Sequence, residues 1–124
     1  MYCLDTNIII DLLRGSKEVI DKLETLESED LFVAPITLFE LFKVSDNEEE
    51  YKIIEELMSQ FSILDFNIEV SKTFGKMFIK LKKIGKMIPE EDLMIASFVK
   101  YNNLIFLTRD KKHFENTDIK IEVW

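Results

Sequence analysis

The sequence predicts an α/β domain of three layers, in which a mainly parallel sheet carries helices on both faces. Two observations support this prediction. Short apolar runs that suit buried strands alternate along the chain with segments whose apolar residues recur at helical spacing. Helices separate most of these strands, and such crossover connections make neighbouring strands parallel.

The first half of the chain contains residues that typically begin or end helices and strands. Gly15 ends a first helix, and Ser16 with Glu18 opens a second one. Pro35 closes the second strand. The expected elements are a strand at 2–5, helices at 6–14 and 16–27, a strand at 31–34, and helices at 37–44 and 48–60.

The second half continues the alternation. Gly85 ends a long helix, and Pro89 sits near the start of the next one. The expected elements are a strand at 61–66, helices at 68–84 and 91–101, and strands at 104–107 and 119–123.

Composition places the chain among ordinary small domains. Its 124 residues suit a single domain, 1–124, and 47% hydrophobic residues are enough for a core. With 3 Gly and 2 Pro, neither a disordered nor a collagen-like chain fits. The one cysteine, Cys3, cannot form an internal disulfide, which suits a reducing compartment. Without a signal peptide or a long apolar run, we expect a cytoplasmic protein with no membrane partner.

Charge is unevenly distributed along the chain. The formal net charge of −8 argues against indiscriminate binding of nucleic acid. Residues 46–56 are acidic, however, whereas residues 72–86 hold six Lys and no acid. This lysine run either guides RNA phosphates or forms the solvated face of an amphipathic helix. Net charge therefore does not exclude a nucleic-acid substrate.

Four acids are candidates for a shared site. In a parallel α/β sheet the site lies beyond the carboxyl ends of the strands, where Asp5 and Asp110 follow the first and fourth strands. Asp92 heads the helix that leads into the fourth strand, and Glu40 follows the second strand. Each acid also has a simpler interpretation: a helix cap for Asp5, the wet side of a helix for Glu40, a first-turn acid for Asp92 and a turn residue for Asp110.

Together the four acids predict a metal site. Four carboxylates in one cleft would repel one another and raise their pKa values unless cations neutralise them. Mg²⁺ or Mn²⁺ accepts such oxygen ligands and suits the hydrolysis of phosphodiester bonds. No Ser–His–Asp or Cys–His arrangement competes, since Cys3 lies in a predicted strand and the only histidine, His113, is expected to be a partly exposed turn residue.

Three motifs carry a resemblance to a known family. LDTNIIIDLLRG resembles the opening motif of PIN domains of the VapC toxin family, ITLFEL resembles the segment with that family's Glu, and EEDLMIASFVKYNNLIFLTRDKKHF resembles its closing block. The resemblance implies a sheet in the order 3-2-1-4-5, a magnesium-dependent endoribonuclease and a small antitoxin partner. It assigns metal binding to Asp5, Glu40, Asp92 and Asp110, and supporting polar roles to Thr6, Asn7 and Thr108.

The resemblance leaves several assignments open. Many relatives carry Gly, Ala or Asp where this chain has Glu90 and Glu91, so an extra acidic ligand is an alternative. Arg109 either contacts a phosphate or pairs with an acid. The further candidates for RNA binding are Arg14, Lys82 and Lys83.

The resulting functional prediction is a homodimeric endoribonuclease that uses Mg²⁺ or Mn²⁺. One alternative is a PIN nuclease that processes RNA without a toxin role. Another is a non-catalytic module that keeps the PIN fold for binding. The non-catalytic module predicts a broken set of acids, whereas the set in this chain is complete.

Overall fold

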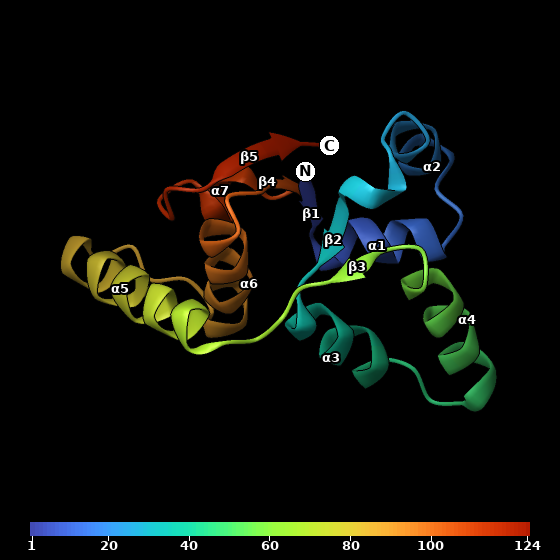
Figure 1. Cartoon of the computed structure of the whole chain (residues 1–124), viewed down its shortest axis with the longest axis horizontal. Coiled ribbons are helices and arrows are strands. Elements are labelled where there is room, and N and C mark those ends of the chain that lie inside the picture. Colours follow the sequence, from blue (N-terminus) through green and yellow to red (C-terminus); the bar gives the residue numbers. More distant parts are fainter.

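One five-stranded sheet lies at the centre of the molecule (Figure 1). The computed structural model describes all residues, 1–124. All four strand pairs are parallel, and the order is β3-β2-β1-β4-β5, which confirms the predicted sheet. The strands are β1 (Tyr2–Leu4), β2 (Leu31–Val33), β3 (Ser62–Ile63), β4 (Ile105–Thr108) and β5 (Lys120–Val123).

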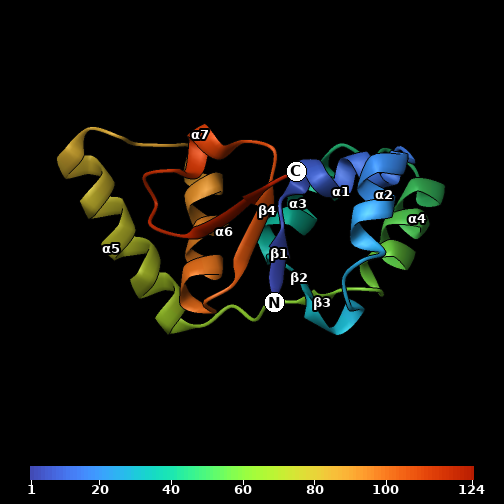
Figure 2. The same ribbon diagram turned by 90° about the horizontal axis from the view of Figure 1, so that it is seen from above.

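Helices cover both faces of this sheet, as expected (Figure 2). Helices α1, α2 and α4 lie on one side, and α5, α6 and α7 lie on the other. The helices are α1 (Thr6–Leu13), α2 (Lys17–Leu23), α3 (Pro35–Lys43), α4 (Glu48–Met58), α5 (Ile68–Ile84), α6 (Glu90–Tyr101) and α7 (Lys111–Phe114), with one 3₁₀ turn at Ser28–Asp30. None of them is long and apolar enough to cross a membrane.

The strands divide the core into two halves because side chains alternate between the faces of a sheet. On the central strands, Cys3 and Phe106 join the core beneath α5 and α6. Their neighbours Leu4 and Leu107 join the core beneath α1, α2 and α4. All four are fully buried, and burial raises the pKa of the Cys3 thiol to about 12. Cys3 is therefore a core residue, as its place in a strand predicted.

Several element boundaries differ from those expected. Helix α2 ends at Leu23 rather than near Glu27, and the 3₁₀ turn fills the connection to β2. Pro35 is the first residue of α3, a position where its missing amide proton costs nothing. The third strand is shorter than the expected 61–66 and lies at an edge of the sheet, where it pairs only with β2. Helix α7, which follows β4, was not predicted.

Helix α5 is the longest element and lies at the outer flank of the molecule, beside α6 (Figures 1 and 2). Asn67 caps its first turn by accepting a hydrogen bond from the amide of Val70, at 2.9 Å. Gly85 ends it in the left-handed region, with φ of 68°, where glycine is favoured. The chain then turns through residues 86–89 and enters α6, whose first turn contains Asp92.

Candidate active site

The register between the two central strands positions Asp5. Leu4 pairs with Leu107, so Asp5 and Thr108 are the next residues of the two strands. The Asp5 amide donates to the carbonyl of Leu107 at 2.9 Å, and Thr108 Oγ1 donates to Asp5 Oδ2 at 2.6 Å. Asp5 occupies the N-cap position of α1, but its side chain makes no capping hydrogen bond. The carboxylate therefore points to the strand edge rather than serving the helix.

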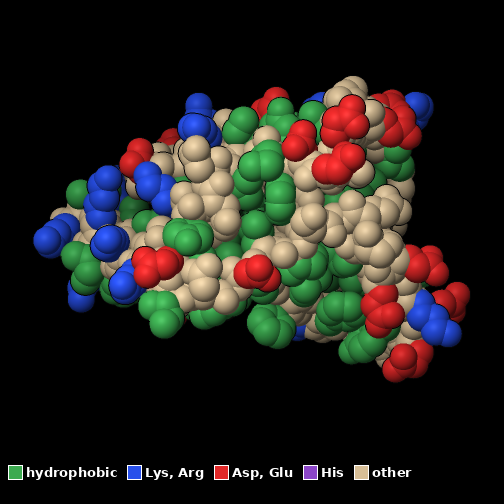
Figure 3. All heavy atoms as spheres, viewed as in Figure 1, with side chains coloured by type: hydrophobic (Ala, Val, Ile, Leu, Met, Phe, Trp, Pro, Cys, Tyr) green, Lys and Arg blue, Asp and Glu red, His purple; other side chains and the backbone are tan.

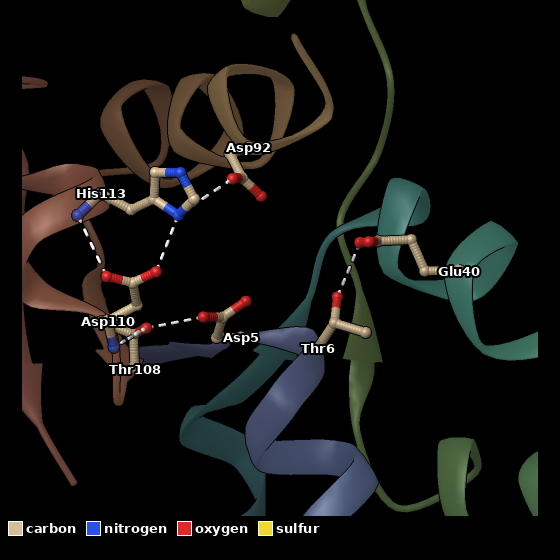
Figure 4. Close-up of polar contacts among 7 residues, drawn as sticks. All are labelled: Asp5, Thr6, Glu40, Asp92, Thr108, Asp110 and His113. Atoms are coloured by element: carbon tan, nitrogen blue, oxygen red, sulfur yellow. Dashed lines mark hydrogen bonds and ion pairs between the residues drawn. The ribbon is translucent and has the colours of Figure 1, made fainter. Parts of the chain in front are cut away.

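Glu40 reaches the same edge from the second turn of α3. Thr6 Oγ1, at the start of α1, donates a hydrogen bond to Glu40 Oε1 at 2.8 Å. The hydroxyl of Thr37 lies 3.1 Å from that of Thr6. Because Thr6 follows Asp5 directly, this contact ties α3 to the end of β1 and holds Glu40 across the cleft from Asp5 (Figure 4).

Asp92 and Asp110 lie on the other side of the cleft, with His113 between them (Figure 4). Asp110 caps α7 by accepting from the His113 amide at 3.2 Å. The His113 ring Nδ1 lies 2.7 Å from Asp110 Oδ2 and 3.5 Å from Asp92 Oδ2. The sequence predicted a partly exposed turn residue at His113. Its side chain is partly exposed, as expected, but the turn is wrong, since His113 belongs to α7 and contacts two acids. The available signal was its position three residues after Asp110, an N-cap spacing.

These residues surround a cleft with a volume of about 310 Å³. The side chains that line it are those of Asp5, Thr6, Asn7, Ile10, Glu40, Lys43, Val44, Asp92, Asp110, His113 and Phe114. All four predicted acids are thus brought together, from four separate segments of the chain.

Burial and mutual repulsion perturb two of these acids. The pKa of Asp92 rises to about 6, chiefly because burial disfavours its charged form and further because Asp5, Glu40 and Asp110 repel it. The pKa of Asp5 is raised by burial and by the charges of Glu40 and Asp110, although the Thr108 hydrogen bond opposes the rise. Such shifts are typical of sites that hold a cation or perform acid–base chemistry.

The donor set fits a hard divalent cation. Four carboxylates offer the oxygen ligands that Mg²⁺ and Mn²⁺ prefer. No three Asp, Glu, His or Cys side chains are gathered closely enough to surround an ion in the present arrangement. To hold an ion, the acids would have to draw together, and the positive charge would then relieve the repulsion that raises the pKa of Asp5 and Asp92.

Only some of the other polar residues near the four acids line the cleft. Asn7 lines the cleft but makes no side-chain hydrogen bond to the acids. Lys43, which sequence reasoning missed, also lines the cleft and brings a positive charge to it from the end of α3. Glu90 and Glu91 are exposed in the first turn of α6 and do not line the cleft.

None of the four cationic candidates for RNA binding lines the cleft. Arg109 pairs with Asp11 on α1, with Nη1 3.3 Å from Oδ2, so the structure favours the acid pair over free contact with a phosphate. Arg14 is exposed at the far end of α1 from Asp5. Lys82 and Lys83 are exposed near the end of α5.

Comparisons with known proteins agree with this architecture. Ribonuclease VapC2 of Haemophilus influenzae is 30% identical over 99% of this chain and 97% of its own length. Ribonuclease VapC3 of Methanocaldococcus jannaschii is 37% identical over 76% of this chain and 93% of its own. A chain of the VapBC-1 structure from nontypeable Haemophilus influenzae aligns with a TM-score of 0.87 and 32% identity, covering 99% of this chain and 97% of that one. Residues 2–120 match the PIN domain family, and the chain belongs to that family, within its VapC ribonuclease group.

Proposed function

We propose that this protein is an endoribonuclease that requires Mg²⁺ or Mn²⁺ and acts as the toxin of a toxin–antitoxin pair. The observation that carries the proposal is the set of four carboxylates, from four separate segments, that lines one cleft. Relatives over nearly the full chain are named ribonucleases, and one from Salmonella typhimurium, 26% identical, is named a tRNA(fMet)-specific endonuclease. The complete acid set speaks against a non-catalytic module.

The chain's own residues would hold the reacting groups in place. Asp5, Glu40, Asp92 and Asp110 would hold the ion. When bound, it would lower the pKa of a water and neutralise charge that develops on the phosphate. Thr108 orients Asp5 by its 2.6 Å hydrogen bond. Lys43 lines the cleft, and its ammonium would attract a phosphate oxygen there.

Contacts around three of the acids would set their orientation before an ion binds. Thr6 donates to Glu40 Oε1 and thereby fixes one oxygen of that carboxylate. The ring of His113, on α7, contacts Asp110 and Asp92 and would likewise fix the orientation of their carboxylates. Side chains that are already oriented lose less freedom when the ion binds, which favours a defined arrangement over a mobile one.

The proposed partner is a small VapB-like antitoxin. Solved structures similar to this chain include VapBC complexes from Haemophilus influenzae and, with a TM-score of 0.91 and 25% identity, from Rickettsia felis bound to promoter DNA. An acidic cleft would attract an Arg or Lys side chain inserted by such a partner. Co-expression with the neighbouring reading frame should give a stable complex with suppressed nuclease activity. If no complex forms, or if activity persists within it, an RNA-processing role without an antitoxin becomes the better explanation.

A second copy of the chain is the other expected partner. Phe39, Phe66 and Ile68 have exposed fractions of 72%, 69% and 74%, which is unusual for such large apolar side chains. Phe66 also borders an apolar hollow that Ile36 and Phe74 line. Sedimentation equilibrium of the isolated chain tests the homodimer, and a monomer at all concentrations would contradict it.

The cleavage proposal is tested with purified chain and total cellular RNA. We expect cleavage with Mg²⁺ or Mn²⁺, loss of cleavage in EDTA, and recovery when the ion is returned. Glu40→Gln should lower the rate by about 100-fold or more, on the order of a lost metal ligand or electrostatic stabiliser. Glu48→Gln, at an exposed acid on α4, is the matched control and should leave the rate unchanged. Full activity of metal-free protein would overturn the mechanism.

A further inference from the structure

The outer face of α5 is strongly basic, although the chain as a whole is acidic. Six of its 16 Lys and Arg residues, and none of its 24 Asp and Glu residues, lie within residues 70–89. This segment therefore carries +6, whereas the other 104 residues carry −14. In Figure 3 the blue side chains gather at the α5 end of the molecule, and red ones gather over α2 and α4.

Four of these lysines form a continuous stripe along the helix. Lys72, Lys76, Lys80 and Lys83 line a shallow groove together with Gly75 and Ile79. They recur every three or four residues, so their Cα atoms follow one helix face over roughly 17 Å at 1.5 Å per residue. We call these four residues the lysine stripe.

The lysine stripe is largely free of compensating charge. Lys72 lies 3.4 Å from Glu69, whereas Lys76, Lys80 and Lys83 have no acid within ion-pair distance. Asp118 lies close enough to Lys80 to feel its charge, but it pairs with Lys100, which lowers the pKa of Asp118 more than Lys80 does. Three ammonium groups therefore stand available to an external anion.

Gly75, at the centre of the lysine stripe, leaves the helix backbone open. An added Cβ there would meet no atom within 4 Å, so packing inside the chain does not require a glycine. Glycine within a helix is also unfavourable for the helix itself. The absence of a side chain lets a ligand approach the backbone between the lysine stems.

We propose that the lysine stripe binds the phosphate backbone of the RNA segment that flanks the bond to be cut. The proposal rests on the nuclease function proposed above. Because the cleft and the rest of the chain are negative, RNA needs a cationic surface to stay bound, and the lysine stripe supplies one. Its C-terminal end lies on the same side of the molecule as α7, which borders the cleft (Figure 2). Helix α6 lies between α5 and the sheet (Figure 2), so the stripe holds a flanking segment rather than the reacting phosphate.

The test compares RNA binding by two variants that have the same net charge, because each loses four lysines. One replaces Lys72, Lys76, Lys80 and Lys83 with Gln. The other, as the control, replaces Lys17, Lys22, Lys52 and Lys120, which lie on α2, α4 and β5. Binding of a fluorescent single-stranded RNA of 20 or more nucleotides is followed by anisotropy in EDTA, with the RNA checked for integrity afterwards. Circular dichroism and unfolding in urea verify that both variants fold.

We expect the stripe variant to bind about tenfold or more weakly near physiological salt. The slope of log K against log salt should fall in magnitude by about 2, at about 0.7 for each of three lost single-strand phosphate contacts. The control variant should bind within about twofold of the unchanged chain. In Mg²⁺, the stripe variant should show a raised KM for the long RNA and an unchanged kcat for an RNA of a few nucleotides.

Equal weakening by both variants, or no weakening by the stripe variant, would overturn the proposal. The same measurement with fluorescent polyglutamate tests for an acidic protein partner. If the stripe variant loses binding to polyglutamate but still binds RNA as the unchanged chain does, the proposal is overturned in favour of such a partner. Failure of the nuclease function is distinguishable, because the unchanged chain would then cleave no RNA in Mg²⁺ while anisotropy still reports which lysines bind it.

Discussion

Replacing Asp92 with Asn offers a sharp test of the acidic cleft, because the ionised carboxylate opposes folding there. The pKa of Asp92 is raised from 3.8 to about 6 in the folded chain, mainly by burial. Its side chain is 23% exposed and has His113 as its nearest ion-pair partner, at 3.5 Å. A raised pKa means that Asp92 contributes stability below its unfolded pKa and loses that contribution as pH rises through about 6.

The size of the effect follows from the pKa rise. At about 1.4 kcal/mol per pKa unit, ionised Asp92 disfavours the folded state by about 3 kcal/mol at pH 8. Asn removes this penalty but also loses the favourable interaction of an acid with the N-terminus of α6, about 0.3–1 kcal/mol. We therefore expect Asp92→Asn to raise the free energy of unfolding of metal-free protein by about 2 kcal/mol at pH 8, and to change it little near pH 4, where Asp92 is neutral in the folded state.

Urea unfolding in EDTA at pH 4 and pH 8, at fixed protein concentration, measures this difference. Asp65→Asn is the matched control, since Asp65 is exposed and does not line the cleft; it should show no such pH dependence. Adding Mg²⁺ at 100 times its Kd should then stabilise the unchanged chain and the control by about 2.7 kcal/mol, and Asp92→Asn by much less. The reasoning is refuted if Asp92→Asn destabilises at pH 8, or if its effect is the same at both pH values.

Four further variants test individual contacts of the site and of α5. Asp5→Asn should abolish RNA cleavage, by about 100-fold or more, while metal-free stability stays equal or rises because repulsion falls; an active enzyme would disprove the central assignment. Thr108→Val removes the hydrogen bond to buried Asp5 and should cost about 1–3 kcal/mol in urea unfolding at pH 8, with a smaller cost at low pH where Asp5 is neutral. Gly75→Ala should raise the unfolding free energy by about 0.5–1 kcal/mol, since its Cβ meets nothing, and a loss would reveal a hidden contact. His113→Gln should weaken Mg²⁺ binding measured by calorimetry, because Asp92 and Asp110 lose the ring between them; unchanged affinity would show that the ring has no positioning role.

Most of the architecture could be predicted because each signal was local. Apolar runs marked the strands, and Gly15, Gly85 and Pro89 marked helix ends close to where they occur. The carboxyl-edge rule placed Asp5 and Asp110 near one another without any coordinates. Parallel strands with helical crossovers leave few alternative arrangements, which is why the sheet followed from the pattern.

The parts that could not be predicted depend on short elements and on contacts between distant residues. Helix α7 has four residues, too few to show helical periodicity. The spacing from Asp110 gave a signal for one contact of His113, but its contact with Asp92 joins residues that only the folded chain brings together. Lys43 reaches the cleft from the end of α3, and its apolar surroundings in the sequence gave no sign of that. The pairing of Arg109 with Asp11 likewise joins residues far apart in the sequence.

The electrostatics of the cleft determine how its function can be tested. Asp5 and Asp92 have raised pKa values because burial and neighbouring acids oppose their ionisation. Any cation that enters the cleft relieves this opposition, whether it is a divalent ion or a basic side chain of a partner. Stabilisation by Mg²⁺ alone would therefore demonstrate binding but not catalysis. Since a basic side chain would relieve the same repulsion without supplying an activated water, a catalytic role requires that stabilisation and RNA cleavage depend on the same ion and are lost together when Asp5 or Asp92 becomes Asn.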